Sequence, residues 1–171
     1  PDVEVMITDD EMNELAVGQI GEICVRGPNV MTGYHNALEL TAQTIVDGWL
    51  RTGDLGRFDE DGHLYIVDRK KDMVIVGGIN VYPREVEECI QRMPSVAEVA
   101  VVGKPSRLRG EVVAAYVVPA EGCECSAQEV ISHCREHLAP YKVPKQVYFI
   151  DRLPKSAIGK VLKGQLRALQ V

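Results

Sequence analysis

Short strands are predicted over the first 70 residues, where apolar and polar positions alternate in brief stretches. Residues 3–8 and 20–26 show this pattern, and a polar turn separates them. Residues 49–68 predict a β-hairpin, because Asp61-Gly62 supplies the left-handed backbone that its turn requires. Residues 36–45 predict a short helix with Leu38, Thr41, Ala42 and Ile45 on one face.

A second group of elements begins after residue 70, and its strands are richer in β-branched residues. Residues 73–76 form a short apolar run that is followed by a glycine pair. Residues 96–102 and 112–118 are dense in valine and predict two paired strands. Residues 147–150 predict a further strand.

Helices alternate with these strands. Pro83 opens the first helix, at a position where its missing N–H costs nothing, and Pro94 ends it. Ser126 and Glu129 have the spacing of a capping box and predict the start of a second helix. Residues 161–169 predict a final short helix.

Strands and helices therefore alternate without long parallel runs after residue 70. This order predicts a compact α+β domain with a short mixed sheet flanked by helices. Residues 69–71 form a charged break between two apolar segments. We place the boundary there, so the predicted domains are residues 1–70 and residues 71–171.

Charge and composition narrow the classes of function. Apolar residues make up 46% and charged residues 26% of the chain, as in ordinary soluble proteins. No apolar run approaches the roughly 18 residues that a transmembrane segment needs. The net charge of -6 argues against general binding of nucleic acid or anionic membrane. Seven basic residues and one acidic residue follow Tyr141, and this local excess indicates a phosphate-bearing ligand.

Five cysteines form an odd set without the spacing of a disulfide framework, which indicates a reducing, cytoplasmic setting. Zinc is one interpretation of Cys123, Cys125, His133, Cys134 and His137, because the two histidines are four residues apart on a helix. However, Cys134 lies on the apolar face of that helix, and the other two cysteines lie in a polar turn. We therefore predict no metal site.

Three segments contain residues suited to chemistry. Residues 48–56 (GWLRTGDLG) place Asp54 beside glycines at a strand start, where a carboxylate can meet two vicinal hydroxyls. Residues 68–87 (DRKKDMVIVGGINVYPREVE) lead from a charged cluster through a strand and a glycine pair into a helix. Residues 153–161 (LPKSAIGKV) carry Lys160 after a flexible glycine. Each segment alone is also consistent with an ordinary turn or a solvated surface.

Together and in this order, the three segments resemble the adenylate-forming superfamily, which includes acyl-CoA synthetases, firefly luciferase and the adenylation domains of peptide synthetases. The resemblance covers essentially the whole chain. It implies that residues 1–70 are the β-rich end of the large domain and that residues 71–171 are the mobile C-terminal lid domain. It also implies that a carboxylate attacks the α-phosphate of ATP to give an acyl-adenylate and pyrophosphate, after which coenzyme A takes the acyl group.

The resemblance implies nucleotide-binding roles for residues near the predicted boundary. Asp54 would hold the ribose hydroxyls of ATP and of the adenylate. Arg69 would bind the ribose or phosphate region, with Ile66 nearby. Lys71 falls at the hinge about which the C-terminal domain turns between the two half-reactions.

The same resemblance implies two roles in the C-terminal domain. Gly77 and Gly78 would line the tunnel for the pantetheine arm of coenzyme A. Lys160 would be the catalytic lysine that bridges the acyl carboxylate and the phosphate. Both reacting groups are anionic, so the first step needs a cation, and a lysine on a mobile domain can supply one and withdraw it. Further basic residues could meet the phosphates of coenzyme A, through Lys142, Lys145 or Lys155.

Other motifs of the superfamily do not occur in this chain. The Ser/Thr/Gly-rich loop that embraces pyrophosphate is absent, and so is the aromatic-Gly-x-Thr-Glu motif that contacts adenine and helps to hold Mg²⁺. Because Pro1 also leads straight into a strand-like segment, we expect an excised fragment whose Mg²⁺ ligands lie in a preceding part. We expect the fragment to be inactive alone and to self-associate through apolar surface of residues 1–70.

The sequence is most similar to medium- and long-chain fatty acyl-CoA synthetases within the superfamily. The expected substrates are a small-molecule carboxylic acid, ATP and coenzyme A, without nucleic acid. One alternative is an adenylation domain that loads a carrier protein. A second is a non-catalytic C-terminal binding module, although such a module has no need of Asp54 and Lys160.

Overall fold

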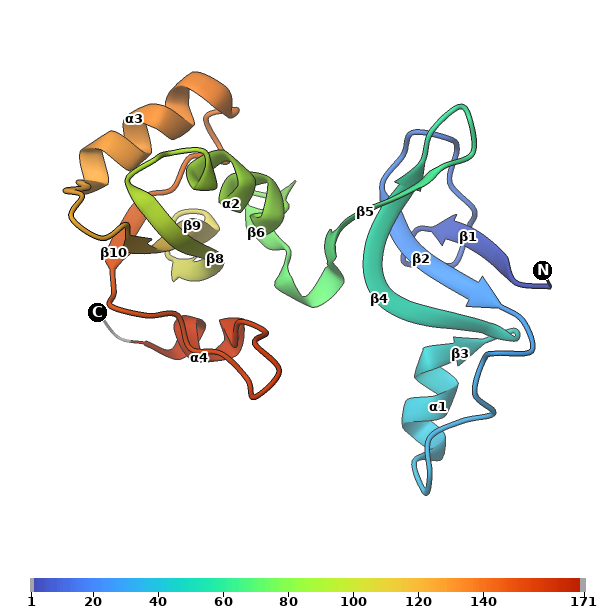
Figure 1. The fold of residues 1–171 in the computed structure, drawn as a ribbon. Coiled ribbons are helices and arrows are strands. Elements are labelled where there is room, and N and C mark those ends of the chain that lie inside the picture. The colour runs from blue at the N-terminus through green and yellow to red at the C-terminus, as the bar shows by residue number, and fades with distance from the viewer. Residues whose placement is uncertain (1, 170–171) are drawn as a thin grey trace. The chain divides into compact units, whose positions relative to one another are not determined.

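The protein comprises two compact units, residues 1–71 and residues 72–171. A computed structural model describes residues 2–169 (Figure 1), so Pro1 and residues 170–171 of the predicted domain ranges lie outside the described residues. Each unit contains a five-stranded sheet with helices. The predicted α+β class is therefore confirmed.

The first unit is an antiparallel sheet with the order β1-β2-β4-β3, in which β5 also pairs with β4. Its elements are β1 (Glu4–Thr8), β2 (Gly21–Arg26), α1 (Leu38–Thr44), β3 (Ile45–Val46), β4 (Trp49–Phe58) and β5 (Leu64–Arg69). The hairpin expected around Asp61-Gly62 is present as β4 and β5, and Gly62 has a φ of +79°. The small core of this unit consists of Ile7, Ile23, Cys24 and Leu55.

The face of α1 that carries Leu38, Thr41 and Ala42 is not buried. No residue of α1 is buried, and Leu38 is 86% exposed. Ile45 lies outside the helix, because the chain turns there into β3 and pairs with β4. Residue spacing indicated a helix correctly, but it could not show whether a partner surface covers that helix.

The second unit has a mixed sheet with the order β10-β9-β6-β7, and β8 pairs with β9. A 3-10 helix (Lys70–Asp72) precedes it across the unit boundary. The elements that follow are β6 (Val74–Val76), β7 (Ile79–Val81), α2 (Pro83–Gln91), β8 (Val96–Ser106), β9 (Gly110–Pro119), α3 (Ala127–His137), β10 (Gln146–Phe149) and α4 (Lys163–Ala168). The pairing of β10 with β9 is parallel, and the other pairings are antiparallel. Strand β7, which the sequence analysis did not predict, forms a short hairpin with β6.

Both faces of the second sheet are covered, because successive side chains of a strand point to opposite faces. One face packs against α2 and α3 in a cluster that includes Val101, Val113, Ala115 and Val117 from the strands. The other face carries Ala100, Val102, Ala114 and Tyr116, which pack with Leu153 and with Leu166 of α4. The valine-rich central strands β8 and β9 therefore contribute side chains to two apolar cores, one on each face of the sheet.

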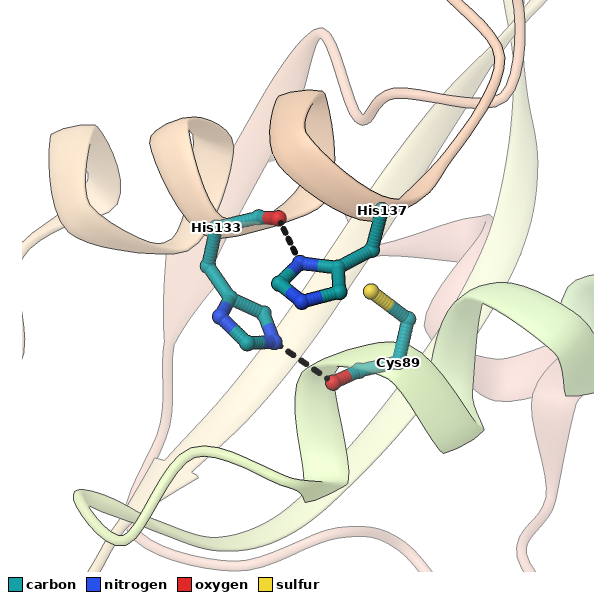
Figure 2. Close-up of side chains that lie close together, drawn as sticks. All are labelled: Cys89, His133 and His137. Carbon is teal, nitrogen blue, oxygen red and sulfur yellow. Dashed lines mark hydrogen bonds between the residues drawn. The ribbon is translucent and has the colours of Figure 1, made fainter.

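The helix ends follow the predicted signals. Pro83 occupies the first turn of α2. Ser126 caps α3: its Oγ accepts the Glu129 N–H at 3.3 Å, and its own N–H donates to Glu129 Oε2 at 2.8 Å. Helices α2 and α3 are also joined by a hydrogen bond of 3.0 Å between His133 Nε2 and the Cys89 carbonyl oxygen (Figure 2). The helices within residues 2–169 are all too short or too polar to span a bilayer.

Replacement of Tyr116 by Phe tests the docking of α4. The Tyr116 side chain is fully buried, and its hydroxyl donates to the Leu166 carbonyl oxygen at 3.0 Å. Tyr116→Phe removes the donor to a buried carbonyl, so we expect the free energy of unfolding to fall by about 1–3 kcal/mol. Urea denaturation of the chain measures this. Tyr148→Phe is the control, because its ring is partly exposed and its centroid lies 5.0 Å from that of the Tyr116 ring. An equal loss of unfolding free energy in both variants would contradict the role of the Tyr116 hydroxyl.

Candidate functional site

Asp54 and Arg69 lie opposite each other on β4 and β5. The Arg69 Nε donates to Asp54 Oδ1 at 3.1 Å. The side chains are 36% and 52% exposed for Asp54 and Arg69, respectively. An exposed ion pair contributes little to stability, and both groups remain accessible to a ligand.

The backbone around Asp54 is shaped by the residues that precede it. Gly53 has a φ of +74°, and a Cβ added there would meet no atom within 4 Å. Conformation rather than lack of space therefore favours glycine at this position. Thr52 Oγ1 donates to the Ile23 carbonyl oxygen at 2.8 Å and accepts the Asp54 N–H at 3.1 Å. Through Thr52, these bonds hold the backbone N–H of Asp54 next to β2.

A cavity of about 400 Å³ lies beside this segment. It is lined by Thr52, Gly53, Arg69, Lys70 and Lys71. Three of these five residues are cationic, so the cavity suits an anionic ligand. The size is within the usual range of small-molecule sites.

The other predicted residues of the first unit lie on β5 and directly after it. Ile66 pairs with Gly56 and is 57% exposed, as an apolar contact for a ligand would require. Lys71 is in the 3-10 helix and is the last residue of the first unit. Asp68 is buried, and its Oδ1 accepts the Arg69 N–H at 2.7 Å, which fixes the backbone next to Arg69.

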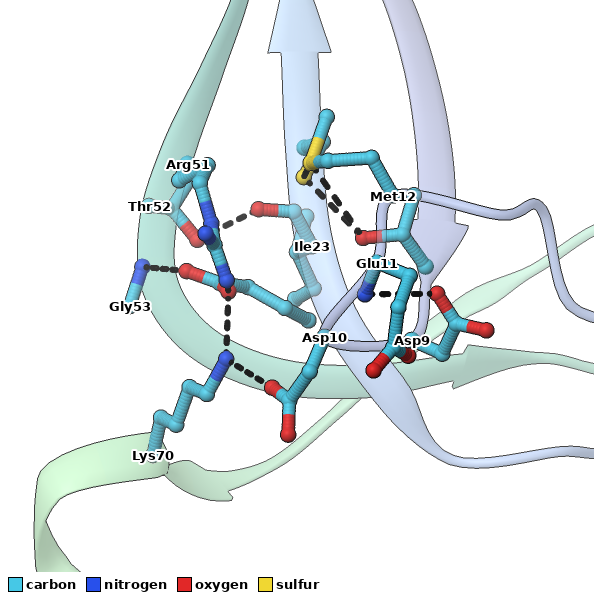
Figure 3. A network of polar contacts seen from close by, with 12 residues as sticks. Asp9, Asp10, Glu11, Met12, Ile23, Arg51, Thr52, Gly53 and Lys70 are labelled. Atoms are coloured by element: carbon cyan, nitrogen blue, oxygen red, sulfur yellow. Dashed lines mark hydrogen bonds and ion pairs between the residues drawn. The ribbon is translucent and has the colours of Figure 1, made fainter. Parts of the chain in front are cut away.

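Glu22 forms a buried polar centre that the sequence analysis missed. Its Oε2 accepts bonds from Arg51 Nη2 at 2.8 Å and from Lys70 Nζ at 2.9 Å, and its Oε1 accepts the Gly53 N–H at 3.1 Å. Figure 3 labels these three partners, Arg51, Gly53 and Lys70. Burial alone raises the pKa of the Glu22 carboxyl, but the bonds from Lys70 and Arg51 bring that pKa below its ordinary value. The available signal was an acidic residue directly before the apolar run of residues 23–25.

Gly77 and Gly78 form the two-residue turn between β6 and β7, which pair up to Val76 and Ile79. Both have positive φ, +59° and +84°, as a type I′ hairpin turn requires. A Cβ added at either position would meet no atom within 4 Å. The turn is therefore open on its outer side, where a thin ligand has room to approach the backbone.

Lys160 lies in a tight loop whose backbone is well held. The Ser156 N–H donates to the Lys160 carbonyl oxygen at 2.8 Å, and Ser156 Oγ accepts the Lys160 N–H at 3.2 Å. Gly159 has a φ of +80°, which lets the chain turn just before the lysine. Within residues 2–169, no ion-pair partner holds the Lys160 ammonium group. The loop therefore presents an exposed cation on an ordered backbone.

Three other lysines after Tyr141 form ion pairs within the second unit. Lys142 Nζ lies 2.6 Å from Glu85 Oε1, and Lys163 Nζ lies 2.7 Å from Glu87 Oε1. Lys155 pairs with Glu98. Intramolecular ion pairs thus account for part of the basic excess that the sequence analysis attributed to a ligand.

Comparison with known proteins identifies the family. Residues 1–35 match the family model of the AMP-binding enzymes, and residues 85–160 match the model of the AMP-binding enzyme C-terminal domain. The chain belongs to the adenylate-forming superfamily of AMP-binding enzymes. The predicted resemblance is confirmed, and the matches correspond to the C-terminal portion of the superfamily.

Relatives within the adenylate-forming superfamily include ligases for different acids. The long-chain-fatty-acid–CoA ligase of Salmonella typhimurium is 50% identical over 167 residues, which are 98% of this chain and 30% of that protein. The indoleacetate–CoA ligase of Aromatoleum aromaticum is 46% identical over 169 residues, which are 99% of this chain and 33% of that protein. The chain thus spans about a third or less of the length of these relatives.

A solved structure shows the same fold. The crystal structure of ATP-bound MatB from Rhodopseudomonas palustris matches with a TM-score of 0.94 and 44% identity. The match covers 98% of this chain and 34% of that one. Membership of the adenylate-forming superfamily is therefore supported by both sequence and fold.

The predicted set of possible metal ligands is not the set that the structure brings together. His133 and His137 lie near Cys89 of α2, and their ligand atoms are all within 4.8 Å of one another (Figure 2). Neither Cys123 nor Cys125 belongs to this group. Both histidine rings already bond to backbone carbonyl oxygens, His133 Nε2 to Cys89 and His137 Nδ1 to His133 at 2.8 Å. Burial raises the pKa of the Cys89 thiol, which favours its protonated form. The three side chains therefore pack together without a metal ion.

We accordingly expect a chelator to leave the melting temperature of the chain unchanged. A metal would need the Cys89 thiolate and would have to displace the bond of His133 to the Cys89 carbonyl. Cobalt(II) titration followed by visible and near-ultraviolet absorption measures binding directly. A thiolate-to-cobalt band that is lost in Cys89→Ser but retained in Cys123→Ser would contradict this expectation.

Proposed function

We propose that the chain supplies the C-terminal part of an ATP-dependent carboxylic acid:CoA ligase. In the first step, a carboxylate oxygen bonds to the α-phosphorus of ATP and pyrophosphate leaves, which gives an acyl-adenylate. In the second step, the sulfur of coenzyme A bonds to the acyl carbon, AMP leaves, and the thiol proton is released. The chain covers 30–34% of the relatives and solved structures described above, so this activity refers to the longer protein.

The paired Asp54 and Arg69 carry this proposal. An exposed carboxylate can accept two hydrogen bonds from vicinal ribose hydroxyls, while the adjacent guanidinium binds ribose or phosphate oxygens. The cationic cavity beside Gly53 offers space for that ligand. Exposed Ile66 lies two residues before Asp68 on the same strand and supplies an apolar neighbour.

Lys160 is proposed as the catalytic lysine of the first step. Its ammonium group is exposed, and its loop fixes the backbone rather than the side chain. A mobile side chain of this kind can place its charge between the attacking carboxylate and the phosphate. Lys71, at the end of the first unit, is the proposed hinge on which residues 71–171 turn as a lid, with residues 1–70 ending the large domain.

The proposed partner of the second step is coenzyme A. Its pantetheine arm would pass the open turn of Gly77 and Gly78, where the absence of side chains allows close approach. The acid is proposed to be a medium- or long-chain fatty acid, because the fatty-acid ligase is 50% identical to this chain. Mg²⁺ would accompany ATP, and we assign it no ligand among residues 2–169. The proposed setting is cytoplasmic.

Lys160→Ala in the full-length protein tests whether Lys160 acts in the first step and not in the second. Carboxylate-dependent ATP–pyrophosphate exchange, measured over a panel of acids, should fall by about two to three orders of magnitude. Formation of the CoA ester from supplied acyl-adenylate should persist, because that step does not need the charge at Lys160. Lys155→Ala is a matched control for the exchange reaction, which does not involve coenzyme A, since this lysine is in the same loop but pairs with Glu98.

Each outcome of that experiment decides a different point. Strong exchange with fatty acids would support the proposed acid class. A preference for an aromatic acid would show that the fatty-acid proposal is wrong. Exchange that is indifferent to Lys160→Ala would remove Lys160 from the mechanism. If no acid supports exchange, the ligase proposal fails, and the non-catalytic module takes its place.

The chain without its preceding part is expected to self-associate. In the first unit, Leu38 is 86%, Val17 61% and Ile66 57% exposed, so apolar surface faces solvent. Size-exclusion chromatography with light scattering should give a mass that rises with protein concentration. Leu38→Gln should weaken this rise, and Leu108→Gln in the second unit should not. A constant monomer mass at all concentrations would contradict the expectation.

A further inference from the structure

Glu22 is a buried carboxylate to which the proposed chemistry gives no role. It lies on β2 with a side chain that is 5% exposed. A carboxylate removed from water needs compensating charge and hydrogen bonds. Arg51 supplies two bonds, from Nε at 3.0 Å and from Nη2 at 2.8 Å, and Lys70 supplies one at 2.9 Å.

The two carboxylate oxygens of Glu22 bind different parts of the chain. Oε1 accepts the Gly53 N–H at 3.1 Å, whereas Oε2 accepts the bonds from Arg51 and Lys70. Arg51 and Gly53 belong to β4, and Lys70 follows β5 directly. These groups converge in Figure 3, so a single carboxylate ties together three neighbouring segments of the first unit.

The tied residues are sequence neighbours of the proposed nucleotide contacts. Gly53 directly precedes Asp54, and Lys70 lies between Arg69 and Lys71. The direct bond from Arg69 to Asp54 joins two exposed side chains, so by itself it is a weak restraint. The part-buried bonds of Glu22 are better suited to keep the two backbones in place, because water competes less for them.

We propose that Glu22 is a positioning residue that sets the spacing of Asp54 and Arg69 and anchors the chain just before the hinge at Lys71. The inference rests on the proposed function, since it concerns the same nucleotide site. On the β5 side, Glu22 acts through its bond to Lys70, which directly follows Arg69. Its Nζ also lies 2.5 Å from Asp10 Oδ1, so Lys70 is held between two carboxylates and not free to follow a moving ligand.

The positioning role predicts a selective kinetic effect in the full-length protein. Glu22→Gln keeps the size of the side chain and an acceptor for Gly53 but removes the charge that holds Arg51 and Lys70. We expect KM for ATP to rise by about tenfold or more, the loss typical of one charge-assisted contact. KM for coenzyme A should stay unchanged, because the proposed coenzyme A contacts are in the second unit. Glu60→Gln is the control, an exposed glutamate in the β4–β5 turn.

Lys70 variants separate positioning from general damage to the fold. Lys70→Arg retains a cation and should keep KM for ATP near the wild-type value, whereas Lys70→Met should raise it. If Glu22 acts through Lys70, the penalty of the double variant Glu22→Gln/Lys70→Met will be smaller than the product of the two single penalties. All variants are assayed well below their melting temperatures, which are recorded by circular dichroism.

The outcomes distinguish this inference from the proposed function. If the wild-type protein shows exchange that Lys160→Ala abolishes, but Glu22→Gln leaves KM for ATP unchanged, the positioning role alone is wrong. Equal rises in KM for ATP and coenzyme A, or multiplicative penalties in the double variant, would also overturn it. If the wild-type protein shows no exchange with any acid, the proposed function fails and the inference falls with it.

Discussion

A carboxylate can be buried in a small β-sheet only when cations and N–H groups replace the water that it loses. In the first unit, Glu22 meets this requirement by drawing Arg51, Lys70 and the Gly53 N–H to one point. The apolar core of this unit is small, and these bonds add to the backbone pairing that joins β2, β4 and β5. Asp54 and Arg69, the exposed groups of the candidate nucleotide site, lie on β4 and β5 next to these bonds.

The second unit is held by a different kind of interaction. Its central strands β8 and β9 are covered on both faces, and alternate valine, alanine and tyrosine side chains enter two separate apolar clusters. Apolar packing on both faces of its sheet gives this unit a core of its own. A domain that moves as a rigid body needs this independence, which is consistent with the proposed action of residues 71–171 as a lid.

The residues proposed for chemistry share a common design, in which an ordered backbone presents an exposed polar or flexible group. Asp54 follows Gly53, which has positive φ, Lys160 follows Gly159, and Gly77 and Gly78 form an open turn. The glycines shape the backbone, while nearby hydrogen bonds hold it. A ligand can then approach without the cost of ordering a loose loop.

Much of the fold could be predicted from local signals: the Asp61-Gly62 hairpin, the Ser126 capping box, the Pro83 helix start and the valine-rich strands each depend on neighbours in sequence. The motifs around Asp54, Arg69 and Lys160 likewise indicated the superfamily. Long-range pairing decided the rest. Strand β7 exists because Val74 and Val76 pair with Val81 and Ile79, Leu38 faces solvent because no described surface covers α1, and Cys89 rather than Cys123 joins the histidines. Nothing in the sequence linked Glu22 to Lys70, 48 positions away, because only the folded sheet brings the two charges together and removes water from between them.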